Sequence, residues 1–122
     1  SRALRRFDGQ YIKSTGDGTL ATFSSPTRAL QCAVVIRDVA RASGLRVRIG
    51  LHSGEVEHRA ADLVGTAVNL AARVQAQANP GEILVSRTIV DLVAGSGLSF
   101  VDRGAHVLRG IKREWRLFAL TV

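Results

Sequence analysis

Residues 10–23 read QYIKSTGDGTLATF, and this stretch decides how the first part of the chain folds. Gln10–Ser14 and Leu20–Phe23 are short strand candidates, and the two glycines around Asp17 favour a tight hairpin loop between them. An aspartate at such a tip presents its carboxylate clear of other side chains. It could therefore hold a magnesium ion together with phosphate oxygens. The simpler interpretation is a turn that binds no metal, because Gly-Asp-Gly is good turn chemistry by itself.

The rest of the chain alternates helix and strand patterns. Ser25 and Pro26 predict the start of a helix and Gly44 predicts its end. Residues 47–51 alternate apolar and polar side chains, which predicts a strand running on towards Val56. We further expect a loop at 59–63, a helix at 65–78, a strand at 83–85, a brief helix at 86–93, and closing strands at 100–103, 106–108 and 115–120 with turns at Gly104 and Gly110. This order predicts an α/β or α+β sandwich of sheet and helices.

A second polar cluster lies between Asp62 and Arg73. Asn69 and Arg73 are four residues apart, so on the predicted helix they share one face. With Asp62 just before the helix, this edge could orient a ribose and bind phosphate charge. The alternative, which the segment alone favours, is an ordinary solvated helix edge.

The composition of the chain argues against several classes of function. The 122 residues carry a net charge of +7, 46% hydrophobic residues and one cysteine. We expect a single cytoplasmic domain over residues 1–122, with no disulfide framework and no membrane contact. The basic residues are spread along the chain without interleaved aromatics, which argues against nucleic-acid binding and suits a small polyanionic substrate. The three histidines lack the spacing of a zinc site, and the chain has neither a serine-hydrolase elbow nor a P-loop.

Taken together, five stretches in register resemble the class III nucleotidyl cyclases. They are Lys13–Gly18, Gly50–Val56, Asp62–Arg73, Pro80–Ser86 and the closing region from Asp102 to Phe118. The resemblance implies an α+β, ferredoxin-like βαββαβ-type sandwich of bacterial adenylyl cyclase type. It also implies conversion of ATP to 3′,5′-cyclic AMP and pyrophosphate in a head-to-tail homodimer, a reaction of intracellular signalling.

The resemblance also implies a role for each candidate. Lys13 and Asp62 match the pair that reads the purine; guanylyl cyclases typically have glutamate and cysteine there, so ATP is the expected substrate. Asn69 matches the residue that orients the ribose, and Arg73 the one that stabilises charge on the pentavalent phosphorus. Asp17 matches the second of two aspartates that hold two Mg²⁺ or Mn²⁺ ions.

One part of the family pattern has no counterpart. The family's first strand carries the other metal-binding aspartate, whereas Ser1–Phe7 resemble the end of the helix before the hairpin. We therefore expect an N-terminally truncated domain that lacks an inner strand and is inactive alone. The alternative function is a catalytically inactive cyclase-homology module acting in dimerisation or nucleotide sensing.

Overall fold

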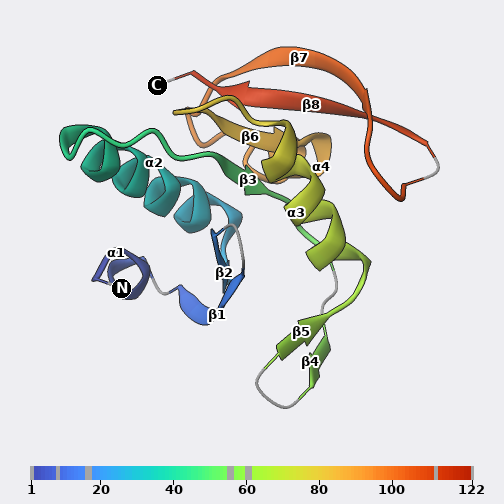
Figure 1. Ribbon diagram of the computed structural model, residues 1–122. Helices are drawn as coiled ribbons and strands as arrows, with labels where there is room; N and C mark the ends of the chain where they lie inside the picture. The colour runs from blue at the N-terminus through green and yellow to red at the C-terminus, as the bar shows by residue number, and fades with distance from the viewer. Residues whose placement is uncertain are drawn as a thin grey trace.

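A computed structural model describes residues 2–7, 9–15, 18–54, 57–59, 62–111 and 113–121; for 10–15, 18–20, 57–59 and 62–64 it describes the backbone. The helices are α1 (Arg2–Arg6), α2 (Pro26–Ala42), α3 (Thr66–Gln77) and α4 (Arg87–Leu92) (Figure 1). The strands are β1 (Gln10–Thr15), β2 (Gly18–Thr22), β3 (Ile49–Leu51), β4 (Glu57–Arg59), β5 (Asp62–Val64), β6 (Ile83–Ser86), β7 (Phe100–Val107) and β8 (Glu114–Leu120).

A four-stranded sheet forms the centre of the fold. Its order is β3-β6-β8-β7, with β3 parallel to β6 and the other two pairs antiparallel. Helices α2 and α4 supply the core on one face, and α3 supplies the core on the other. The predicted α+β sandwich is confirmed.

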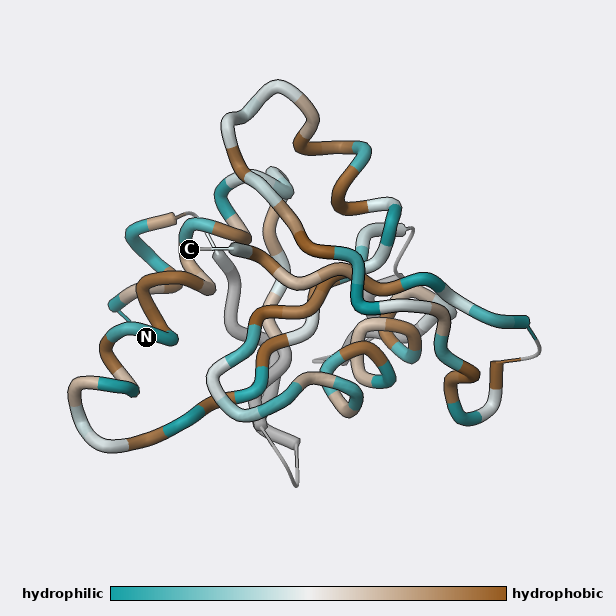
Figure 2. The backbone as a smooth tube through the Cα atoms, turned by 90° about the horizontal axis from the view of Figure 1, so that it is seen from above, coloured by the Kyte–Doolittle hydropathy of each residue, from teal (hydrophilic) through white to brown (hydrophobic). Residues whose placement is uncertain are grey.

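The core follows from the alternation of side chains along the strands. On β6, Ile83 and Val85 pack with the α2 and α4 cluster, while Leu84 between them packs with the α3 cluster. All three are essentially inaccessible to solvent. Because successive strand residues point to opposite faces, a short apolar run serves both cores. Hydrophobic residues accordingly gather along the strands that cross the middle of the molecule (Figure 2).

The predicted start and end of α2 are confirmed. Ser25 caps the helix, and its Oγ accepts a hydrogen bond from the Arg28 N–H at 3.3 Å. Pro26 occupies the first helical position, where a missing N–H costs nothing. Gly44 follows the helix with a φ of 81°, a conformation that favours glycine.

Three predictions about the strands are wrong. The strand expected to run from residue 47 towards Val56 covers Ile49–Leu51. The loop expected at 59–63 contains the paired residues Arg59 and Asp62 of a β4–β5 hairpin, whose short strands show no hydrophobic alternation to detect. The turn expected at Gly104 lies inside the continuous strand β7. There the register shifts between Asp102 and Ala105, and the Gly104 N–H donates to Asp102 Oδ1 at 2.7 Å.

Two hairpins lie outside the four-stranded sheet. Strands β1 and β2 form one two-stranded sheet, and β4 and β5 form another. The expected lack of an inner strand is not tested by the described residues and stays a prediction. Within the described ranges, no helix has the length and apolar character needed to cross a membrane.

Candidate functional site

Helix α3 carries two of the five predicted site residues. It spans Thr66–Gln77, as predicted, and starts after Gly65, which adopts a φ of 133°. Gly65 has no side chain to cap the helix, and the first turn contains no acidic residue. Packing therefore fixes the helix, through the buried side chains of Leu70, Val74 and the following Ala78.

Asn69 and Arg73 lie one turn apart on this helix, as predicted. Each directly precedes a buried residue, Leu70 or Val74, which anchors its turn against the sheet. Asn69 is exposed and Arg73 is half-buried. An amide and a guanidinium on one helix edge can donate hydrogen bonds to a hydroxyl and to phosphate oxygens.

The helix lies unusually close to strand β3. A Cβ atom on Gly50 would lie 2.3 Å from the Gln75 backbone nitrogen and 2.5 Å from its Cα. A Cβ on Gly54 would lie 2.9 Å from the Ala67 Cβ. The Gln75 side chain also donates from Nε2 to the Arg48 carbonyl at 3.2 Å. Two glycines thus let α3 approach the sheet without side chains between them.

A histidine network lies on the same face of the sheet. His52 Nδ1 and Ser86 Oγ share a hydrogen bond of 2.7 Å. The His52 ring also meets the Trp115 ring edge-on, with centroids 5.6 Å apart. Burial lowers the pKa of His52 below its ordinary value. The pair is no hydrolase dyad, because Ser86 has no exposed surface on which to meet a substrate.

Sequence reasoning missed this network because it considered His52 only as a metal ligand. One signal was available: Gly50 and His52 are two residues apart around a strand end, so they share a face. Their partners Ser86 and Trp115 come from distant positions, and no spacing rule connects them.

Two further predicted residues lie on the hairpins. Lys13 is on β1 opposite Leu20, and Asp62 begins β5 opposite Arg59. Strands β1 and β5 are in contact, so the backbones that carry Lys13 and Asp62 come together. Asp17 lies outside the described residues.

The described side chains form no metal cage. Among them, no group of three or more histidine, cysteine, aspartate or glutamate residues could hold an ion. Cys32 is buried, and burial raises the pKa of its thiol, which makes it a core residue and not a ligand.

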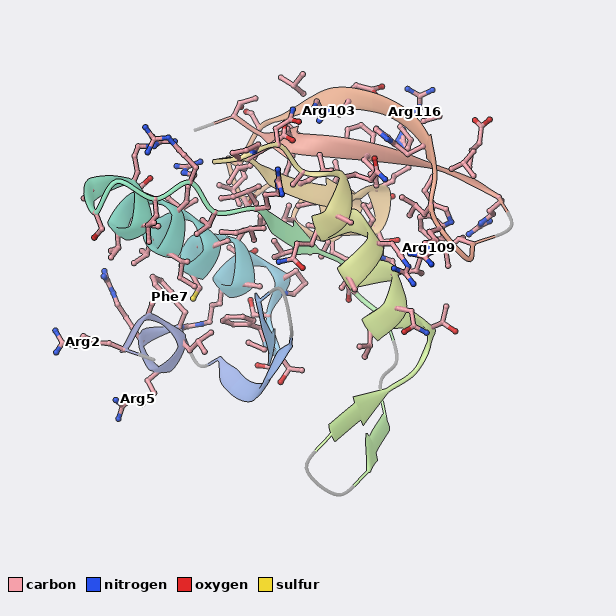
Figure 3. The ribbon with its side chains drawn as sticks, in the orientation of Figure 1. Arg2, Arg5, Phe7, Arg103, Arg109 and Arg116 are labelled. Carbon is pink, nitrogen blue, oxygen red and sulfur yellow. The ribbon has the colours of Figure 1, made fainter. Side chains whose placement is uncertain are left out.

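The arginines account for the net positive charge and lie mostly at the periphery. Arg2 and Arg5 project from α1 away from the body of the molecule (Figure 3). Arg103 forms a two-pronged ion pair with Glu82 at 2.8 and 3.1 Å, and Arg116 pairs with Asp102 at 2.8 Å. These ion pairs tie β7 to the start of β6 and to β8.

The chain is similar to proteins of one family. The family described as adenylate and guanylate cyclase catalytic domain matches residues 4–122. A crystal structure of an adenylate/guanylate cyclase/hydrolase from Silicibacter pomeroyi is 30% identical, with a TM-score of 0.88 over 99% of this chain and 77% of that one. A Trypanosoma brucei adenylate cyclase structure in its monomeric state shares the fold, with 22% identity and a TM-score of 0.85 over 98% of this chain and 72% of that one.

A curated relative supports the same grouping. The pH-sensitive adenylate cyclase MT1302 of Mycobacterium tuberculosis (strain CDC 1551 / Oshkosh) is 31% identical over 114 residues, which are 88% of this chain and 29% of that protein. Across the curated relatives that it matches, the chain spans from 19% to 36% of their own length.

Proposed function

Because the chain belongs to the adenylate and guanylate cyclase catalytic domain family, we propose that it is an adenylyl cyclase catalytic domain. It would form 3′,5′-cyclic AMP and pyrophosphate from ATP, as part of intracellular signalling in the cytoplasm. The observation that carries this proposal is the edge of α3, where Asn69 and Arg73 stand one turn apart on a helix packed directly on the sheet.

The reaction needs positioning and charge stabilisation more than covalent help from the protein. The ribose 3′-hydroxyl attacks the α-phosphorus, and pyrophosphate leaves from the opposite side. Asn69 would hold the ribose so that this hydroxyl is in line. Arg73 would donate to the phosphoryl oxygens, whose negative charge grows as the phosphorus becomes pentavalent. Its planar fork suits that task better than a lysine would.

Lys13 and Asp62 would select adenine over guanine. The lysine donates to adenine N1, and the aspartate accepts from the 6-amino group. Contact between β1 and β5 supports this pairing, because it brings together the two strands that carry these residues.

The metal requirement points to a second subunit. Asp17 matches one of the family's metal ligands, and one carboxylate with phosphate oxygens suits a single Mg²⁺ or Mn²⁺ better than two. When bound, such ions would activate the 3′-hydroxyl and neutralise the triphosphate. A head-to-tail dimer would join the metal ligands of one subunit to Lys13, Asp62, Asn69 and Arg73 of the other. The exposure of Asn69 supports a site completed across subunits.

A mixing assay tests the proposal. We expect no measurable cyclic AMP from the 122-residue chain alone. The partner is an intact cyclase subunit whose own equivalents of Asn69 and Arg73 are mutated, so that it supplies only the metal ligands. Cyclic AMP formed only in the mixture supports the proposal, and Arg73→Ala in this chain is the matched control that should abolish it. If the mixture binds an ATP analogue and stays inactive, the chain is a nucleotide-sensing module instead.

A further inference from the structure

Three strand ends meet at His52. This residue follows β3, hydrogen-bonds Ser86 at the end of β6, and packs edge-on against Trp115 near the start of β8. Ser86 is completely buried, so its hydroxyl depends on this hydrogen bond. The Trp115 indole N–H is also buried and has no acceptor within the described ranges, so packing alone holds this ring. The polar neighbours of the Trp115 ring are His52, which meets it edge-on, and Arg113, whose Cζ lies 4.7 Å from the ring centroid.

The network of His52, Ser86 and Trp115 lies beneath the part of α3 that carries Asn69 and Arg73. Helix residue 67 lies over residue 54, and helix residue 75 lies over residue 50, so the helix runs back along the β3 segment. A helix rises about 1.5 Å and a strand about 3.3 Å per residue, so position 52 falls level with about residue 71. Residue 71 is midway between Asn69 and Arg73. Trp115 packs against the cluster that contains Leu70 and Val74, the residues that anchor those two side chains.

We propose that His52 is a positioning residue: through Ser86 and Trp115, its ring fixes where α3 sits on the sheet and therefore where Asn69 and Arg73 are held. The role of His52 in placing α3 does not depend on the proposed function. The consequence for catalysis rests on the proposed function.

Protonation should weaken this arrangement. Burial lowers the pKa of His52 in the folded chain. Just below the ordinary histidine pKa, His52 is therefore protonated in the unfolded chain but still neutral in the folded one. The contribution of the neutral ring to stability is therefore complete above the ordinary histidine pKa. It is lost as the pH falls through the lower pKa that His52 has in the folded chain. Charged side chains on the surrounding helices are Arg73 on α3 and both Arg87 and Asp91 on α4. Beside Trp115 on its own strand segment lie Arg113, Glu114 and Arg116, and His106 lies opposite it on β7.

The first experiment uses Trp115, the single tryptophan of the chain. An imidazolium beside an indole quenches its emission more than a neutral imidazole does, so emission should fall in one step with a midpoint below the ordinary histidine pKa. His52→Asn keeps a hydrogen-bonding group near Ser86 but cannot titrate, and it should abolish the step. His106→Asn is the matched control: His106 is the cross-strand neighbour of Trp115, yet it bonds to the Arg103 carbonyl on β7. This variant should keep the step.

The second experiment asks whether the helix responds. Amide hydrogen exchange in α3 should accelerate about tenfold in His52→Asn while exchange in α2 stays unchanged, because local openings follow local packing. In the mixing assay, turnover should fall about tenfold with KM within about twofold, as expected when catalytic groups are displaced but remain present. If His52→Asn does not fold, exchange in the natural chain on either side of the emission midpoint gives the same test.

The outcomes separate the two proposals. An emission step that survives His52→Asn, or α3 exchange that stays unchanged when His52 is replaced or protonated, overturns the positioning role. If the natural chain gives no cyclic AMP in the mixture, the proposed function fails, while emission and exchange still decide whether His52 positions α3.

Discussion

Replacing Gly50 by alanine should displace the helix that carries Asn69 and Arg73. The new Cβ would lie 2.3 Å from the Gln75 nitrogen and 2.5 Å from its Cα. Both are backbone atoms in the last turn of a packed helix, so no side-chain rotation can relieve the overlap. Reaching even the 3.4 Å of ordinary contact requires α3 and β3 to separate by about 1 Å.

The expected cost follows from that displacement. Overpacking a core by one methyl group typically costs about 1–3 kcal/mol, and a rigid neighbour puts Gly50→Ala at the upper end. For a domain of this size, about 3 kcal/mol lowers the Tm by roughly 10 °C. The same shift moves Arg73, two residues before Gln75, by a comparable distance. A misplacement of about 1 Å can reduce turnover by about two orders of magnitude.

The assay pairs thermal unfolding with cyclase turnover in the mixed dimer. Gly9→Ala is the matched control: its Cβ would lie 2.6 Å from the Phe23 ring, a side chain that can rotate away. We expect this control to cost less than half as much stability as Gly50→Ala and to leave α3 in place. Gln75→Ala should not rescue Gly50→Ala, because the clash is with the backbone. A Tm within about 2 °C of the natural chain for Gly50→Ala would refute the close approach of helix and strand.

Three further predictions address the site and the ion pairs. Arg73→Ala should cut turnover by about two orders of magnitude with little change in KM; a sharp rise in KM at constant turnover would instead make Arg73 a substrate-binding residue. Lys13→Glu with Asp62→Cys should weaken selectivity for ATP over GTP, because donor and acceptor no longer match adenine, and unchanged ATP kinetics would contradict the assignment. Arg103→Ala should cost about 1–2 kcal/mol in urea unfolding, because its bond to Glu82 is largely shielded from water. Arg116→Ala should cost clearly less, because its bond to Asp102 is half-exposed; equal losses would show that shielding does not matter here.

The sequence predicted those parts of the fold that have local signals. Helix α2 has a serine cap, a proline in its first turn and a glycine at its end, and its boundaries were predicted within two residues. Helix α3 was predicted as well, and with it the shared face of Asn69 and Arg73. These features depend on residues within one or two turns of each other, which is the range over which sequence patterns act.

The features that sequence reasoning missed depend on distant residues or on backbone pairing alone. Gly104 was predicted to make a turn because glycine often does, but strand β8 pairs with β7 on both sides of it and keeps the strand continuous. The β4–β5 hairpin has no apolar alternation, and its two strands pair through the backbone. The link from His52 to Ser86 spans 34 residues, and only the fold brings these side chains together.

The candidate site is divided between two kinds of structure, and this division has a consequence for how it works. Arg73 and Asn69 lie on a helix that packs on the central sheet, whereas Lys13 and Asp62 lie on separate two-stranded hairpins. A two-stranded sheet has little stability without further packing, so the position of the pair proposed to read the purine should depend on contacts such as the one between β1 and β5. The groups proposed to act on the transition state are thus held by the core, and those proposed to recognise the base are held by smaller contacts. Substitutions that loosen the hairpins should therefore reduce base selectivity before they reduce turnover, whereas Gly50→Ala should do the reverse.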